Sequence, residues 1–233
     1  MTYDKTNLEW KRYLELMIER PHLFIPHADY KLITMDEDVS DYERKHNRTL
    51  GVLCETPEHL LVADLISYHG RLMVKERLIP KNMQKHILII PIIHEQFILF
   101  RKFHHPTRNY ITCFPTAFVE NGYKPEQYSI QFLKKCFGPF SGTVFYLNDI
   151  EPNTENYHCT TSVYAVKMQR INLEKRKYLS IDYQLMTEAQ MEEYTEGSFS
   201  FLNRDSYTIA GYAMYAQTKR QMKNHAFFRG DVS

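Results

Sequence analysis

The first apolar pattern along the chain is helical. The apolar residues at helical spacing are Trp10, Tyr13, Leu14 and Met17. Pro21 ends this pattern, because the residue before a proline is disfavoured in helical conformation. The pattern predicts a short amphipathic helix over about residues 7–20. The next stretch, residues 26–49, is polar and only weakly periodic, so we expect a loop there or a second short helix near residues 38–45.

Two pairs of strand-like runs follow. Residues 60–66 and 72–78 flank a short turn segment in which Gly70 supplies the left-handed conformation, which predicts a hairpin. Residues 86–93 and 96–100 flank His94-Glu95 and predict a second hairpin. Its strands are almost continuously apolar, which is typical of strands buried on both faces.

The second half of the chain contains both strand-like and helix-like apolar patterns. A strand is expected at residues 110–114, and Pro125 favours a helix start that leads to a stop at Gly138. Further strands are predicted at residues 142–147, 161–168 and 178–185, and further helices at residues 187–195 and 205–220. Because strands and helices do not alternate regularly, we expect an α/β fold with one mixed sheet between helices.

The charge balance and the lengths of the apolar runs argue against some classes of function. The 29 lysine and arginine residues nearly balance the 28 aspartate and glutamate residues, so no overall field draws the chain to nucleic acid or to an anionic membrane. No apolar run approaches the ~20 residues that span a bilayer, and the first residues lack an apolar signal core. We therefore expect a cytoplasmic protein without nucleic-acid or membrane partners. The four cysteines are widely spaced and suggest neither a zinc site nor a disulfide framework.

Three motifs lie close together in the middle of the chain. They are the run Arg101-Lys102-Phe103-His104-His105-Pro106, the run from Phe114 to Gly122, and the helix ending at Gly138. Together they resemble the Nudix hydrolases, most of all the ADP-ribose pyrophosphatase branch, over roughly residues 60–219. The resemblance implies a Nudix α/β/α sandwich, to which the N-terminal helix and the first hairpin are added.

The catalytic motif of that family, the Nudix box, aligns without gaps with residues 117–138, but its functional residues are replaced. In the family the box glutamates lie on one helix face and hold Mg²⁺ ions that activate water. Ala117 replaces the first glycine. The positions of the loop glutamate, the arginine and the three helix glutamates are occupied by Tyr123, Gln131, Phe132, Lys135 and Cys136. The resemblance therefore predicts no catalytic residues and no metal site in the box.

Other positions keep the chemistry of a binding site. By resemblance and position, the residues expected to contact a ligand are Arg101, His104, Thr116, Glu120 and Lys135. Lys135 carries a positive charge where a metal would lie, so it could hold a phosphate, or it could be a solvated lysine. No cofactor is expected. Mg²⁺ enters only if relocated acids, Glu120 and Glu174, form a different metal site.

The sequence thus predicts a catalytically degenerate Nudix-fold protein that binds a nucleotide-diphosphate, ADP-ribose-like small molecule as a sensor or regulator. Two alternatives stay open: a weak or altered Mg²⁺-dependent pyrophosphatase, and a protein-interaction scaffold. By resemblance we also expect a homodimer. The predicted organisation is an N-terminal extension of helix and loop (residues 1–59), a Nudix-like domain that includes the first hairpin (residues 60–220) and a basic tail (residues 221–233).

Overall fold

The computed structural model divides the chain into two compact units, each described here by itself. It describes residues 8–25, 27–81, 85–105, 108–151, 160–169, 182–196 and 204–228, the last six of these as backbone only. The first unit comprises residues 1–83 and 153–159, and the second comprises residues 84–152 and 160–233. No helix among the described residues is long and apolar enough to cross a membrane.

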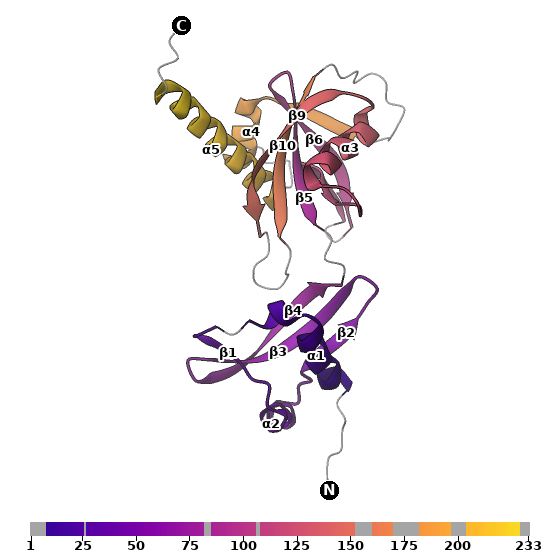
Figure 1. Ribbon diagram of the computed structural model, residues 1–233, viewed down its shortest axis with the longest axis vertical. Coiled ribbons are helices and arrows are strands. Elements are labelled where there is room, and N and C mark those ends of the chain that lie inside the picture. Colours follow the sequence, from indigo (N-terminus) through magenta and orange to yellow (C-terminus); the bar gives the residue numbers. More distant parts are fainter. Residues whose placement is uncertain are drawn as a thin grey trace. The chain divides into compact units, whose positions relative to one another are not determined.

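The first unit is a four-stranded antiparallel sheet with α1, α2 and a 3₁₀ turn (Figure 1). Its elements are α1 (Leu8–Glu19), η1 (Pro21–Phe24), β1 (Tyr30–Leu32), α2 (Asp36–His46), β2 (Gly51–Glu55), β3 (His59–Tyr68) and β4 (Arg71–Pro80). Strand β3 pairs with all three other strands. The hairpin predicted around Gly70 is confirmed: His69 and Gly70 have φ of 48° and 76°, the signs of a two-residue hairpin turn.

The first hairpin belongs to the core of this unit. The sequence placed a boundary at residue 59/60 and assigned the hairpin to the Nudix-like domain, but the compact units divide at residue 83/84. The reason is packing, since Leu60, Val62 and Leu65 of β3 are fully buried in one apolar cluster with residues of α1 and α2. Of the two alternatives for residues 38–45, the helix is present, and β1 and β2 were not predicted.

A polar network lies inside this apolar cluster. The Tyr13 hydroxyl donates to Asp64 Oδ1 at 2.5 Å, and Arg77 Nε donates to Asp64 Oδ2 at 2.6 Å. Arg77 also donates to the Leu23 carbonyl at 2.8 Å. Tyr13 is fully buried, and its burial, with Asp64 beside it, raises the pKa of its phenol. The network connects α1, η1, β3 and β4 through a single carboxylate.

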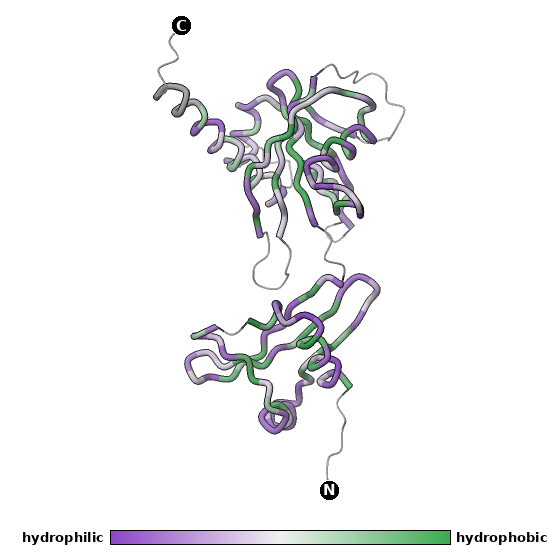
Figure 2. The backbone as a smooth tube through the Cα atoms, in the orientation of Figure 1, coloured by the Kyte–Doolittle hydropathy of each residue, from purple (hydrophilic) through white to green (hydrophobic). Residues whose placement is uncertain are grey.

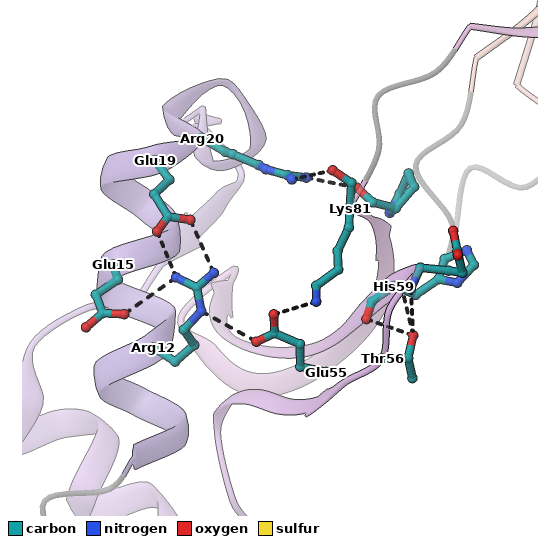
Figure 3. Close-up of polar contacts among 10 residues, drawn as sticks. Arg12, Glu15, Glu19, Arg20, Glu55, Thr56, His59 and Lys81 are labelled. Atoms are coloured by element: carbon teal, nitrogen blue, oxygen red, sulfur yellow. Dashed lines mark hydrogen bonds and ion pairs between the residues drawn. The ribbon is translucent and has the colours of Figure 1, made fainter. Parts of the chain in front are cut away.

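A second network, at the surface, fastens α1 to the ends of β2 and β4 (Figure 3). Arg12 Nη1 lies 2.9 Å from Glu19, and Arg12 Nε lies 3.6 Å from Glu55, which Lys81 also contacts at 2.6 Å. Arg20 donates to the carbonyls of Pro80 and Lys81 at 2.8 and 2.6 Å. The hydrogen bond from Lys81 holds the pKa of the Glu55 carboxyl below its usual value. These contacts add only modestly to stability, because exposed ion pairs are weak.

The second unit is a mixed sheet between helices (Figure 1). Its elements are β5 (His86–Ile93), β6 (Gln96–His104), β7 (Asn109–Cys113), β8 (Thr116–Phe118), α3 (Pro125–Phe137), β9 (Ser141–Ile150), β10 (Thr161–Gln169), β11 (Asp182–Met186), α4 (Glu188–Glu196) and α5 (Ser206–Phe228). The main strand order is β11-β6-β5-β10-β9, with β7 paired to β6 and β8 to β5. Only the β5–β10 pair is parallel among the pairs described.

Strand β5 is apolar along almost its whole length because both of its faces are covered (Figure 2). Ile87 and Ile89 face the cluster beneath α3, and Leu88 and Ile90 face the cluster beneath α4 and α5. This arrangement confirms the predicted sandwich. Gly211 lets α5 approach closely, since a Cβ there would lie 2.7 Å from Leu88 Cδ2. Helix α5 continues to Phe228, through residues that the sequence assigned to a basic tail.

The start of α5 is tied to the strand that precedes the box. Asp205 Oδ2 accepts both the backbone N–H and the hydroxyl of Thr208 at 2.9 Å, which is an N-terminal cap. The Thr208 oxygen in turn accepts the N–H of Phe114 at 2.9 Å. The next carbonyl, that of Pro115, accepts the N–H of Ile89 at 2.9 Å. A short path of hydrogen bonds thus joins α5, the residues before β8 and the central strand β5.

We expect Asp64→Ala to destabilise the first unit by about 3–5 kcal/mol, because it leaves the half-buried guanidinium of Arg77 without its carboxylate. Trp10 is the single tryptophan and stacks on Tyr13 with ring centroids 4.8 Å apart, so its fluorescence during urea unfolding reports on this unit. The matched control is Asp41→Ala, which breaks an exposed pair with Arg44. It should change stability by less than about 0.5 kcal/mol. Equal losses in the two variants would contradict a stabilising role for the network.

Candidate functional site

The segment that the resemblance aligns with the Nudix box folds as a strand, a turn and a helix. Residues 117–138 cover the end of β8, a turn containing Gly122 at φ 89°, and all of α3. Pro125 lies in the first turn of α3, and the N–H of Gly138 closes its last turn on the Lys134 carbonyl at 2.9 Å. Gly138 has φ of 84°, a conformation that favours glycine. The predicted helix and both of its ends are therefore confirmed.

An ion pair occupies the exposed side of this helix. Lys135 Nζ lies 2.8 Å from Glu120 Oε1, and the Tyr128 hydroxyl donates to the same oxygen at 3.1 Å. The hydrogen bond from Lys135 lowers the pKa of the Glu120 carboxyl, and the reciprocal bond raises the pKa of Lys135. Both groups are therefore charged at neutral pH. The ammonium also lies 5.7 Å from the centroid of the Tyr128 ring.

The other two helix positions that the resemblance assigns to glutamates face the core. Phe132 packs against the apolar cluster beneath α3, with its ring 6.5 Å from that of Phe100. Cys136 is buried in the same cluster, and burial raises the pKa of its thiol to about 12. Neither residue provides an oxygen ligand or a thiolate at neutral pH. Both side chains are therefore part of the apolar packing beneath α3.

The remaining box positions are at the surface. Tyr123 is exposed, and its ring centroid lies 5.7 Å from that of Tyr128. Gln131 is exposed on α3. Tyr128 was predicted only as an apolar position of the helix, and its hydroxyl contact with Glu120 was missed. Tyr128 lies seven residues before Lys135, which places the two side chains on one helix face. This spacing could have predicted that Tyr128 contacts the same carboxylate as Lys135.

The predicted ligand-binding residues form more than one group. The structure brings Glu120 and Lys135 together. Arg101, on β6, instead lies 3.5 Å from Asp182, with its guanidinium 4.7 Å from the centroid of the Tyr110 ring. His104 ends β6, and Thr116 begins β8 opposite Leu88 of β5. Arg101 therefore belongs to the β6–β7 hairpin and its neighbour β11.

Magnesium does not fit the box residues in their described positions. The ion takes oxygen ligands in an octahedral arrangement and needs at least one or two carboxylates from the protein. Residues 117–138 contain two carboxylates: Glu120 is engaged by the Lys135 ammonium, and Glu126 lies 3.5 Å from the Tyr164 hydroxyl. Within the described residues, no three His, Cys, Asp or Glu side chains come together to hold a metal. Glu174, the second predicted fallback ligand, lies outside them.

We expect Cys136 to resist alkylation in the folded protein. A thiol with a pKa of about 12 is ionised in roughly one molecule in ten thousand at pH 8, and burial blocks access as well. The comparison is Cys54, which is exposed. Iodoacetamide should label Cys54 quickly and Cys136 slowly, as measured by peptide mass spectrometry over time. In urea the two rates should become similar, and fast labelling of Cys136 in the folded chain would contradict its burial.

Comparisons with known proteins support the fold. No protein-family model and no curated protein matches the chain. A solved structure, described as an ADP compounds hydrolase, matches with a TM-score of 0.60 and 13% sequence identity. The match covers 75% of this chain and 93% of that one. At this identity the likeness concerns the fold alone, and it confirms the predicted Nudix α/β/α sandwich.

Proposed function

We propose that this protein binds a nucleotide-diphosphate ligand, ADP-ribose-like, as a sensor or regulator and does not hydrolyse it by the Mg²⁺ mechanism. The observation that carries the proposal is the Glu120–Lys135 pair, in which Lys135 occupies one of the three helix positions that the resemblance assigns to glutamates. An ammonium there attracts a diphosphate without activating water. The likeness in fold to an ADP compounds hydrolase supports the class of ligand.

Some of the groups around Lys135 favour nucleotide binding, and one opposes it. The Lys135 and Glu120 side chains are each about half exposed, at 56% and 53%, so a ligand can reach them. The exposed ring of Tyr123 next to Tyr128 offers a surface for stacking by a base. Glu120 works against an anionic ligand, because it neutralises Lys135 and repels phosphate. Binding must therefore displace Glu120 from Lys135, which suits a switch that responds to ligand.

This competition predicts opposite effects for the two charged residues. Lys135→Met should weaken ADP-ribose binding by about 10- to 100-fold, because a charge-assisted hydrogen bond contributes about 1.5–3 kcal/mol. Glu120→Gln should strengthen binding, since it frees the ammonium and removes a repulsive charge. Isothermal titration calorimetry in EDTA measures both. Lys134→Met, on the same helix, is the control and should bind like the unaltered chain. Unchanged affinity in Lys135→Met, or binding that requires Mg²⁺, would contradict the proposal.

The two alternative functions predict different results for AMP release and for the thermal shift. A weak or altered pyrophosphatase, supported by the carboxylate of Glu120, would release AMP from ADP-ribose with Mg²⁺ and lose this activity in Glu120→Gln and Glu174→Gln. An interaction scaffold would show no thermal shift with any nucleotide, with or without Mg²⁺. We expect no AMP release and a shift that persists in EDTA. Mg²⁺-stimulated release at ordinary enzyme concentrations would instead establish the enzyme.

We also propose that the protein is a homodimer that pairs through the first unit. Strand β4 is ten residues long, and among the described residues only β3 pairs with it, so its other edge can accept a strand. Leu72, on β4, is 49% exposed. Long edges of this kind favour association with a second copy.

Light scattering should give twice the mass of the chain at micromolar concentration. Leu72→Lys should shift the protein toward monomer, because a charge on an edge strand opposes pairing. Met222→Lys, at an exposed position on α5, is the matched control and should leave the mass unchanged. A monomeric mass for the unaltered chain, or an equal loss of dimer in both variants, would exclude pairing through β4.

A further inference from the structure

The β6–β7 hairpin carries two exposed aromatic rings on one face. Phe103 on β6 lies directly opposite Tyr110 on β7, and the two ring centroids are 5.4 Å apart. The exposed fractions of these residues are 44% and 53%. Leu99, four residues before Phe103 on the same face of the strand, is fully buried in the cluster beneath α4 and α5. The covered part of this sheet face therefore ends before Phe103, and the two rings lie at the surface.

Two arginine side chains flank these rings. The guanidinium carbon of Arg101 lies 4.7 Å from the centroid of the Tyr110 ring, and that of Arg108 lies 5.8 Å from the centroid of the Phe103 ring. The Arg101 side chain is 56% exposed, and Arg108 is exposed as well. The four planar groups contact one another in the order Arg101, Tyr110, Phe103, Arg108. We call this set the arginine–aromatic row.

The turn of the hairpin holds Arg108 at the end of the row. The backbone N–H of Arg108 donates to the His105 carbonyl at 3.2 Å, and its Nη1 lies 3.4 Å from His105 Nδ1. Arg108 has a φ of 53°, a left-handed conformation that is uncommon for residues with a side chain. The turn and the contact with His105 together fix the position of this guanidinium beside Phe103.

The local charge of the hairpin is positive. Residues 101–112 contain Arg101, Lys102 and Arg108 and no carboxylate. Asp182 on β11 lies 3.5 Å from Arg101 and offsets part of this charge. The balanced charge of the whole chain argued against a nucleic-acid partner, because it gives no long-range attraction. It does not prevent a local patch from recognising an anion at short range.

We propose that the arginine–aromatic row binds single-stranded nucleic acid, with bases stacked on Phe103 and Tyr110 and backbone phosphates paired with Arg101 and Arg108. Proteins that bind single strands combine aromatic side chains that stack on bases with cations that contact the backbone. The row provides both kinds of group in direct contact. A double strand keeps its bases stacked inside the helix, so it would use only the two guanidinium groups.

Two other anionic partners match the row less well. An acidic peptide would pair with the arginines and leave the two rings unused. An anionic membrane would be bound through apolar side chains that enter the lipid, in addition to cations. The described residues at the turn, His105, Arg108 and Asn109, are instead polar and exposed. A single strand is the partner that uses the rings and the guanidinium groups together.

The test is fluorescence anisotropy of labelled oligothymidylate and oligouridylate of about 12 nucleotides, titrated with the full chain. Saturable binding of either oligomer is expected, with a duplex of the same length bound about tenfold more weakly or worse. Phe103→Leu and Tyr110→Leu should each weaken binding by about fivefold or more, because leucine keeps an apolar side chain but removes the stacking plane. Tyr146→Leu, at a 51% exposed position on β9, is the matched control and should leave the affinity unchanged.

Charge variants test the phosphate contacts. With two paired phosphates, the logarithm of the association constant should fall with the logarithm of the salt concentration at a slope of about −1.4, and Arg108→Gln should reduce this slope by about 0.7. Asp182→Asn should strengthen binding, because it removes the charge that offsets Arg101. Arg220→Gln, at an exposed position on α5, should change neither the slope nor the affinity.

Several outcomes would overturn the assignment. They are no saturable binding of either oligomer, equal binding of single strand and duplex, equal binding of polyglutamate, and unchanged affinity in both leucine variants. Binding of phosphatidylserine vesicles but not of the oligomers would also overturn it and would indicate a membrane partner. The result is independent of the proposed function, since Lys135→Met should change the affinity for ADP-ribose and leave that for oligothymidylate unchanged.

Discussion

The second unit is built around strand β5, which is apolar on both faces and must bury both of them. Its side chains alternate between the cluster beneath α3 and the cluster beneath α4 and α5, so neither helical layer can be removed without exposing isoleucine or leucine to water. Its two edges are paired with β10 on one side and with β6 and β8 on the other. Both helical layers and the start of the box are therefore placed by one strand.

The segment predicted as the box keeps its fold through packing and through its end residues. The helix of the box is held by Tyr128, Leu133 and Cys136, which face the sheet, and by proline and glycine at its ends. None of these contacts needs a metal. Phe132 and Cys136 add apolar area to the same cluster, while Lys135 and Glu120 form an ion pair at the surface.

The sequence predicted most of the long elements, because continuous apolar runs and a helix bounded by Pro125 and Gly138 are strong local signals. Strands β1 and β8 have three residues each, too few for a period to be visible. The predicted boundary at residue 59/60 differs from the division at residue 83/84, because the sequence pattern of an apolar hairpin does not show which core the hairpin packs into. The Glu120–Lys135 contact was also invisible, since it depends on how the turn between β8 and α3 folds. Arg101 was expected at the ligand by resemblance, and its contacts with Tyr110 and Asp182 depend on pairing across β6, β7 and β11.

The hydrogen bond between Thr208 and Phe114 joins the start of α5 to the segment that leads into β8. Thr208 is fully buried, and Phe114 immediately precedes the proline whose carbonyl holds Ile89 in β5. A buried N–H that loses its acceptor costs about 1–3 kcal/mol, so the start of α5 cannot shift alone. A displacement of α5 would pull on the residues that lead into β8 and the box turn. The position of the α5 start therefore fixes where the chain enters β8.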